Sequence, residues 1–310
     1  MGLLAVIASS AAFATSGPVA KALLATGWTP STLVTARVGI AGLVLLGPAI
    51  VASRGRWGVV RAEWRLIVGV ALTGVAGCQI AYFNAVTHLQ VSVALLIEYL
   101  GIVLVVLWLW LRTGRVPHRA TVGGVALAVL GLVLVLDVSG ASSPDLVGVL
   151  WASSSAIGLA AYFVIIARAH ADLPSVTLAA LGMLLGAALM GALGLAGLLP
   201  WGSAGEPIVL AGRQVPWWWG VLSLSLIAAA FAYLLGAIGA RRLGSTVASV
   251  VGLTEVLFAV FLAWALLDEL PGAAQLVGGA LVVAGVAAVR WGERADVGPV
   301  GDFPAPGGLA

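Results

Sequence analysis

Three side chains that are charged at neutral pH lie inside long apolar stretches of the sequence: Arg37, Glu98 and Glu255. Glu98 is the most conspicuous, because residues 93–111 read VALLIEYLGIVLVVLWLWL and contain no other charged group. A charged residue at the centre of a membrane helix costs about 2.5 to 3.5 kcal/mol on insertion scales, so such residues face a bundle interior or a wet cavity. All three are therefore candidates for binding a charged substrate or a proton.

Arg37 and Glu98 lie at similar depths in two different apolar stretches. Arg37 is about six residues and Glu98 about seven residues from the same membrane face, which places them roughly 9 and 10 Å deep. Equal depth permits an ion pair that only joins two helices. It also permits a site in which Arg37 binds a substrate carboxylate through its planar guanidinium and Glu98 binds an ammonium group or a proton. The sequence leaves both options open, and the second one predicts selection of zwitterions.

Glu255 is a second carboxylate within an apolar stretch. It lies about nine or ten residues from the opposite membrane face, about 14 Å deep by helical rise and near the midplane. Burial in a medium of low polarity disfavours the ionised form of a carboxylate. We therefore expect Glu98 and Glu255 to be the residues that bind a proton if transport is coupled to protons.

Four further side chains are candidates for the same site: one lysine at the end of a span and three uncharged polar residues. Lys21 ends the first apolar stretch just after Gly17-Pro18, a pair that can interrupt a helix and free backbone groups to line a cavity. A lysine at that depth can instead extend to the outer headgroups. Gln79 and Tyr82 share one face of the third stretch, and Tyr162 lies in the sixth. These groups can hydrogen-bond to a substrate or to neighbouring helices.

The composition defines the elements that must position these residues. The chain has 310 residues, of which 62% are hydrophobic and 9% charged, whereas soluble domains carry roughly 25% charged residues. A helix needs about 20 apolar residues to cross a bilayer, and transmembrane strands would instead alternate in polarity. We expect an all-α integral membrane protein with ten transmembrane helices, at residues 3–24, 31–52, 66–87, 91–111, 120–138, 146–167, 175–199, 217–240, 246–267 and 272–290.

The distribution of basic residues predicts the orientation. With both termini in the cytoplasm, twelve of the 15 Lys and Arg residues fall in cytoplasmic segments, and only Lys21 and Arg213 fall in outer loops. This bias follows the positive-inside rule. It also accounts for the pI near 9.5 without a nucleic-acid partner. The expected partners are the lipid bilayer and a small molecule.

The two halves of the sequence resemble each other. A shift of 144 residues aligns Ala8–Ser10 with Ala152–Ser154, and a shift of 154 aligns Trp110 with Trp264, so that spans one, two, four and five match six, seven, nine and ten. The ten additional residues fall in the loop 200–216. Because five is an odd number, the second repeat must cross the membrane in the opposite direction, as in carriers that expose a central site to each side in turn. We expect a first repeat at 1–140, an inverted second repeat at 145–291 and a disordered cytoplasmic tail at 292–310.

Glycines in spans five and ten predict a close helix contact, because small residues let two backbones approach. The contact can form within one chain or between two copies, which leaves a homodimer open. The residues concerned are Gly123, Gly124, Gly131, Gly278, Gly279 and Gly285.

With ten spans and two repeats, the chain resembles the EamA-type branch of the drug/metabolite transporter superfamily over roughly residues 3–290. Within that branch it is similar to bacterial exporters of amino acids of the threonine/homoserine type. This closer likeness rests on Ala20-Lys21, on Ala36-Arg37 and on residues 93–101, which include Glu98. The chain departs from the family pattern at residues 267–269, which read Leu-Asp-Glu where Leu-Gly-Glu is usual. It also departs at Ile102 and Val256, where the family usually has proline.

The resemblance implies a secondary active transporter in the bacterial inner membrane that exports small polar metabolites, most of all amino acids, by alternating access. No catalytic residue, metal site or cofactor is expected. Carriers of nucleotide sugars, lipid-linked molecules or cationic drugs are the alternatives within the same superfamily. An intramembrane enzyme is the alternative from another class, but the sequence lacks HExxH, a Cys/His cluster and the GxxxxGK[ST] motif of ATP-driven pumps.

Overall fold

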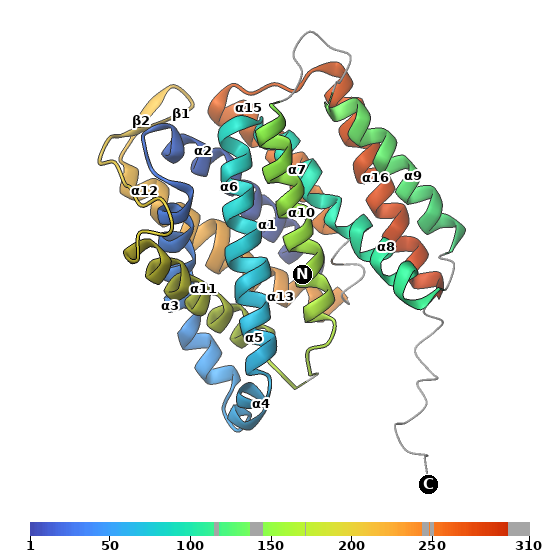
Figure 1. Cartoon of the computed structure of the whole chain (residues 1–310), viewed down its shortest axis with the longest axis horizontal. Helices are drawn as coiled ribbons and strands as arrows, with labels where there is room; N and C mark the ends of the chain where they lie inside the picture. Colours follow the sequence, from blue (N-terminus) through green and yellow to red (C-terminus); the bar gives the residue numbers. More distant parts are fainter. Residues whose placement is uncertain (115–117, 137–144, 171, 244–247, 249–250, 297–310) are drawn as a thin grey trace.

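The structure is a computed structural model, and it describes residues 1–114, 118–136, 145–170, 172–243, 248 and 251–296. Most of these residues are helical (Figure 1). The elements are α1 Gly2–Ala14, α2 Ser16–Ala25, α3 Pro30–Ala52, α4 Trp57–Ala62, α5 Trp64–Val70, η1 Ala71–Gly77, α6 Cys78–His88, α7 Val91–Tyr99, α8 Gly101–Thr113, α9 Arg119–Leu136, α10 Leu146–Ile166, α11 Ser175–Leu195, β1 Ile208–Leu210, β2 Arg213–Val215, α12 Trp217–Leu222, η2 Ser223–Phe231, α13 Ala232–Leu243, α15 Thr254–Leu267 and α16 Ala273–Asp296.

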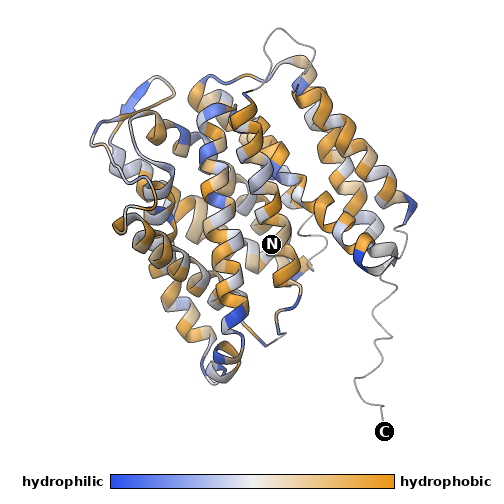
Figure 2. Cartoon of the chain, viewed as in Figure 1, coloured by the Kyte–Doolittle hydropathy of each residue, from blue (hydrophilic) through white to orange (hydrophobic). Residues whose placement is uncertain are grey.

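These helices confirm the all-α membrane fold. Within the described residues, eight helical segments are long and apolar enough to cross a membrane, and two shorter apolar helices, Thr254–Leu267 and Ala273–Val289, supply the ninth and tenth spans. Most residues of the helices are apolar, and polar residues are scattered among them (Figure 2). Leu111, for example, is 83% exposed, as expected for a side chain that faces acyl chains. Helix α16 extends to Asp296, beyond the expected start of the tail at 292, and residues 297–310 lie outside the described part.

A small β-hairpin is an element that the sequence did not predict. Strands β1 and β2 pair antiparallel within the long loop before the eighth span. Ala211 and Gly212 form its turn with φ angles of 51° and 72°, the left-handed values that a two-residue hairpin turn requires. An Ala-Gly pair is a weak signal for such a turn, because alanine rarely adopts positive φ. The hairpin accommodates the additional residues of this loop.

The helices pack across the two repeats. Spans one and eight are in contact through α1 and α13, and spans three and six through α6 and α10. A pseudo-two-fold axis that exchanges the repeats converts the first of these pairs into the second. Spans two and seven, four and nine, and five and ten also pack against each other, and each of these pairs maps onto itself. The core is therefore an interface between the repeats.

Several spans are interrupted at related positions. Span four is broken at Leu100, between α7 and α8, and Leu253 precedes α15 with similar backbone angles in span nine. Spans three and eight contain π-helical segments, η1 and η2, at equivalent places. Span one is broken at Thr15, three residues before Pro18. Pro18 has no N–H and its ring crowds the carbonyl group four residues earlier, which favours a break there.

Glycines bring spans five and ten into direct backbone contact, as the sequence predicted for a contact within one chain. A Cβ atom on Gly131 would lie 2.5 Å from the carbonyl oxygen of Gly278, and a Cβ atom on Gly285 would lie 2.5 Å from that of Gly124. The contacts are reciprocal, which is the pattern that two-fold pseudo-symmetry imposes. A Cβ atom on Gly123 would have no neighbour within 4 Å.

Gly131→Ala should therefore destabilise the protein, because the added methyl group cannot fit without separating α9 from α16. The expected loss is about 1–3 kcal/mol, the usual cost of overpacking. Gly123→Ala on the same helix is the matched control and should leave the midpoint of thermal unfolding in detergent unchanged or slightly raised. Equal midpoints for the two variants would contradict the glycine interface.

Candidate functional site

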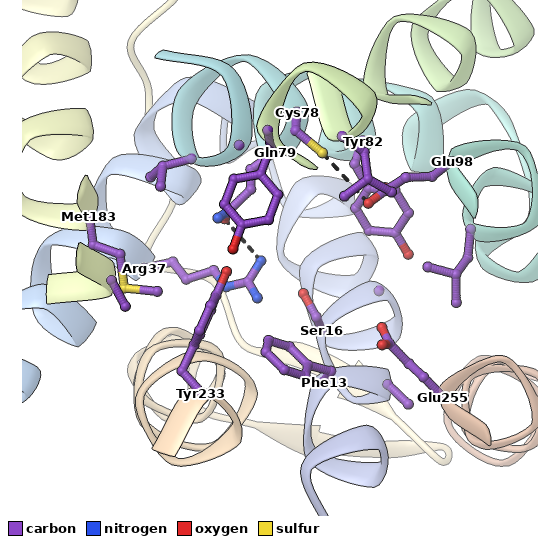
Figure 3. Close-up of a pocket in the computed structure, with 18 of the residues that line it drawn as sticks. Phe13, Ser16, Arg37, Cys78, Gln79, Tyr82, Glu98, Met183, Tyr233 and Glu255 are labelled. Atoms are coloured by element: carbon purple, nitrogen blue, oxygen red, sulfur yellow. Dashed lines mark hydrogen bonds between the residues drawn. The ribbon is translucent and has the colours of Figure 1, made fainter. Parts of the chain in front are cut away.

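A cavity of about 150 Å³ lies at the centre of the bundle, between the two repeats (Figure 3). Its lining comes from spans of both repeats. Six of the seven site residues named from the sequence line it: Arg37, Gln79, Tyr82, Glu98, Tyr162 and Glu255. Lys21 does not.

Arg37 is 6% exposed and has only neutral partners. Its Nη1 donates to Oε1 of Gln79 at 3.1 Å, and its Nη2 donates to the carbonyl oxygen of Ala228, in η2, at 3.0 Å. The guanidinium lies over the ring of Phe83 at 5.6 Å. Its Nε has no hydrogen-bond partner in the part of the chain that the structure describes. Among the described residues, Arg37 and Glu98 form no ion pair, so the helix-joining option that the sequence left open is not the arrangement observed.

Glu98 is bound by residues of two other spans. The hydroxyl group of Ser155, on α10, donates to Oε2 at 2.9 Å, and the thiol of Cys78, on α6, lies 3.6 Å from Oε1. Ser155 belongs to the second repeat and Glu98 to the first. Cys78 is buried and also lines the cavity.

Glu255 belongs to the second repeat and is bound by a residue of the first. Tyr99, at the end of α7 in the first repeat, donates its hydroxyl to Oε2 of Glu255 at 3.0 Å. Each of the two glutamates thus accepts a hydrogen bond from a hydroxyl group of the other repeat. Glu98 lies two residues before the break at Leu100, and Glu255 lies two residues after Leu253. The interrupted helices therefore present both carboxylates to the same cavity.

Lys21 forms a bridge at one end of the bundle. Its Nζ lies 2.5 Å from Oε1 of Glu269 and donates to the carbonyl oxygen of Leu89 at 2.7 Å. The backbone N–H of Val91 donates to Oε2 of Glu269 at 3.1 Å. Asp268 has a left-handed φ of 58°, which turns the chain after α15 toward Lys21. The bridge joins span one to the turn between spans three and four and to the loop before span ten.

A second cavity, of about 420 Å³, lies toward the other end of the bundle. Arg241 at the end of α13 lines it, and the N-terminal Gly2 packs against the next residue, Arg242. Its other lining is largely apolar. The two cavities share five lining residues and are therefore contiguous: Phe13, Val70, Tyr162, Ala179 and Tyr233.

Four polar residues of the site were not named from the sequence. Ser16 lines the cavity, is 7% exposed, and its hydroxyl oxygen has no partner among the described residues. Tyr233 also lines the cavity, whereas Ser155 and Tyr99 bind the glutamates. Tyr233 had a usable signal, as a tyrosine within an apolar span. The serines had none, because serine is common at helix contacts in membranes.

The cavity can bind opposite charges at separate places. Figure 3 shows Arg37 beside Tyr233 and Met183, with Glu98 and Glu255 on the other side of the cavity. Within the described residues there is no group of three or more His, Cys, Asp or Glu side chains that would hold a metal ion. The charged lining residues of the cavity are therefore one guanidinium and two carboxyl groups.

Comparisons with known proteins agree with this architecture. The model of the EamA-like transporter family matches residues 1–137 and again residues 146–291. Fourteen chains of solved structures match as well. One of them, described only as the crystal structure of a protein, superposes with a TM-score of 0.62 at 23% identity, over 94% of this chain and 97% of its own. An identity this low shows a shared fold only. No curated protein matches the sequence.

Gln79→Ala should lower the free energy of unfolding by about 1–3 kcal/mol, because it leaves a buried nitrogen of Arg37 without an acceptor. Asn84→Ala is the control. Asn84 is an amide on the same helix, and it donates only to the carbonyl oxygen of Ile80 one turn earlier. Chemical denaturation of both variants in the same detergent measures the difference. A loss at Asn84 as large as that at Gln79 would count against the role assigned to Gln79.

Proposed function

Because the chain belongs to the EamA-like transporter family, and so to the drug/metabolite transporter superfamily, we propose that it exports small zwitterionic metabolites, amino acids above all, across a bacterial inner membrane. Arg37 binds the substrate carboxylate, and Glu98 and Glu255 bind its ammonium group or a proton. Gln79, Tyr82 and Tyr162 supply neutral hydrogen bonds.

The observation that carries this proposal is the state of Arg37. A guanidinium that is 6% exposed has lost most of its water, and here its protein partners are an amide and a carbonyl group. Burying a charge without an opposite charge is costly. A substrate carboxylate would neutralise Arg37 and would occupy the unpartnered Nε, and charge-assisted bonds of this kind are the strong ones.

The two cavities and the bridge at Lys21 suggest how access alternates. We place the end of the bundle that holds Gly2 and Arg241 in the cytoplasm, as the distribution of basic residues favours. The larger cavity then opens toward the cytoplasm, and the Lys21–Glu269 pair closes the outer side. Substrate enters from the cytoplasm, and release to the outside requires this ion pair to separate.

Protons compete with substrate at the two glutamates. Ionised carboxylates are disfavoured by burial, so each glutamate takes up a proton when the ammonium group leaves and the site faces outward. Return of the protonated carrier brings the proton inward. The result is antiport, with an inward proton gradient driving export.

The alternative substrates of the superfamily fit the site less well. A nucleotide sugar presents two phosphate groups, which usually bind several cationic side chains, whereas the central cavity has Arg37 as the cation among its described lining residues. A cationic drug would use Glu98 and Glu255 but would leave Arg37 without a counter-charge.

Glu98→Gln and Glu255→Gln should each reduce export driven by a pH gradient at least tenfold, because glutamine cannot exchange a proton. Exchange of labelled amino acid without a gradient should fall less for at least one of them. Glu206→Gln, in an exposed loop, is the control and should transport normally. Flux into proteoliposomes is the measurement, and full gradient-driven flux in both cavity variants would exclude proton coupling through these residues.

Lys21→Met removes the Lys21–Glu269 ion pair, so the outer side of the central cavity should be open for a larger fraction of the time. Cys78 is the single cysteine of the chain and lines the central cavity, so a membrane-impermeant thiol reagent added from outside reports that opening. We expect labelling of Cys78 to accelerate at least fivefold in right-side-out vesicles. Asp172→Asn, which removes an exposed pair with His170, should not change the rate.

Cys78→Ser contains no thiol and therefore gives the background of the labelling signal. Lys21→Arg, which retains the charge and the donors, should label nearly as slowly as the parent. Unchanged labelling in Lys21→Met would show that the Lys21–Glu269 pair does not close the outer side.

A further inference from the structure

The two cavities share five lining residues but differ in chemistry, so that a polar part lies next to an apolar part. The polar part is the smaller one, about 150 Å³, and the apolar part is about 420 Å³. The aromatic rings of Phe13, Tyr162 and Tyr233 line both. A molecule that fills the whole space must therefore be amphipathic.

The polar part contains the groups that still need partners. Nε of Arg37 and Oγ of Ser16 are buried, belong to side chains more than nine-tenths buried, and bind no atom of the described residues. Arg37 lies beside Tyr233, which also lines the apolar part, whereas Glu98 and Glu255 lie on the other side of the central cavity (Figure 3). A zwitterionic head placed between these groups has its remaining substituent free to extend past Tyr233.

The lining of the apolar part consists mostly of aliphatic side chains. Its polar lining residues are Ser175, Arg241 and the two tyrosines Tyr162 and Tyr233. A substrate hydroxyl that faces the aliphatic side chains would lose its bonds to water and gain no partner from them. An alkyl or aryl group would instead gain from leaving water, roughly in proportion to its apolar area. The larger aliphatic residues are Leu45, Val70, Ile166, Val176, Leu178 and Leu234.

We propose that the substrate is an amino acid with a large apolar side chain. Its carboxylate binds Arg37 and Ser16, its ammonium group binds Glu98 and Glu255, and its side chain occupies the apolar cavity. This proposal rests on the proposed function and selects one class of amino acid within it. Small hydroxylated amino acids such as homoserine leave the apolar cavity unfilled, and lipophilic cations leave Arg37 unneutralised.

Counterflow of labelled leucine into proteoliposomes of the full chain, preloaded with leucine, tests the selection. Unlabelled leucine and phenylalanine should compete at concentrations at least tenfold lower than threonine and homoserine, and tetraphenylphosphonium should not compete. Threonine or homoserine competing within threefold of leucine would overturn the proposal, as would strong competition by the lipophilic cation. If no amino acid supports counterflow, the proposed function itself fails.

Two valine-to-threonine variants, which keep the size of the side chain, test whether the apolar cavity is the part of the protein that selects the substrate side chain. Val176→Thr adds one hydroxyl to the apolar cavity and should raise the half-maximal concentration of leucine at least threefold without raising that of homoserine. Val260→Thr adds the same group to a separate apolar groove between α7, α15 and α16 and should change neither value. Should Val176→Thr fail to fold, Ala237→Ser places a hydroxyl in the same cavity. Equal effects on both substrates would overturn the assignment of this cavity.

Discussion

A carboxylate inside a membrane protein must find hydrogen-bond donors, and the hydroxyl donors here come from the opposite repeat. Ser155 of the second repeat binds Glu98 of the first, and Tyr99 of the first binds Glu255 of the second. Because neither repeat satisfies its own glutamate through these hydroxyl groups, the polar centre exists only where the repeats meet. The helix packing follows the same rule, since each span has a contact partner in the other half.

The breaks in the helices give this centre its shape. Backbone groups freed in lipid carry a large cost, so breaks are tolerated where they face protein or a cavity. Leu100 and Leu253 interrupt spans four and nine next to the two glutamates, and η1 and η2 interrupt spans three and eight. Arg37 donates one of its hydrogen bonds to a carbonyl group within η2. The irregular backbone and the charged side chains are thus parts of one arrangement.

Hydropathy predicted the transmembrane helices, because the thickness of the bilayer constrains their length. The internal repeat predicted the inverted arrangement, because an odd number of spans per repeat forces the second repeat to cross the membrane in the opposite direction. Six of the seven site residues named from the sequence line the central cavity, since a buried charge or amide in an apolar helix has few other places to lie. Lys21 was ambiguous because a lysine at a span end has a long, flexible side chain, and its partner Glu269 is distant in sequence. The partners Ser155 and Tyr99 could not be assigned, because pairing depends on how the repeats dock.

The glycine contact between α9 and α16 has a consequence for the order in which the protein can be completed during synthesis. Helix α9 leaves the ribosome well before α16, the helix whose backbone fits against Gly124 and Gly131. Until α16 has been made, the glycine surface of α9 has no helix to pack against, and until α10 has been made, Glu98 lacks the hydroxyl group of Ser155. The nascent first half is therefore an incomplete intermediate with an unpaired helix surface and an unpaired carboxylate.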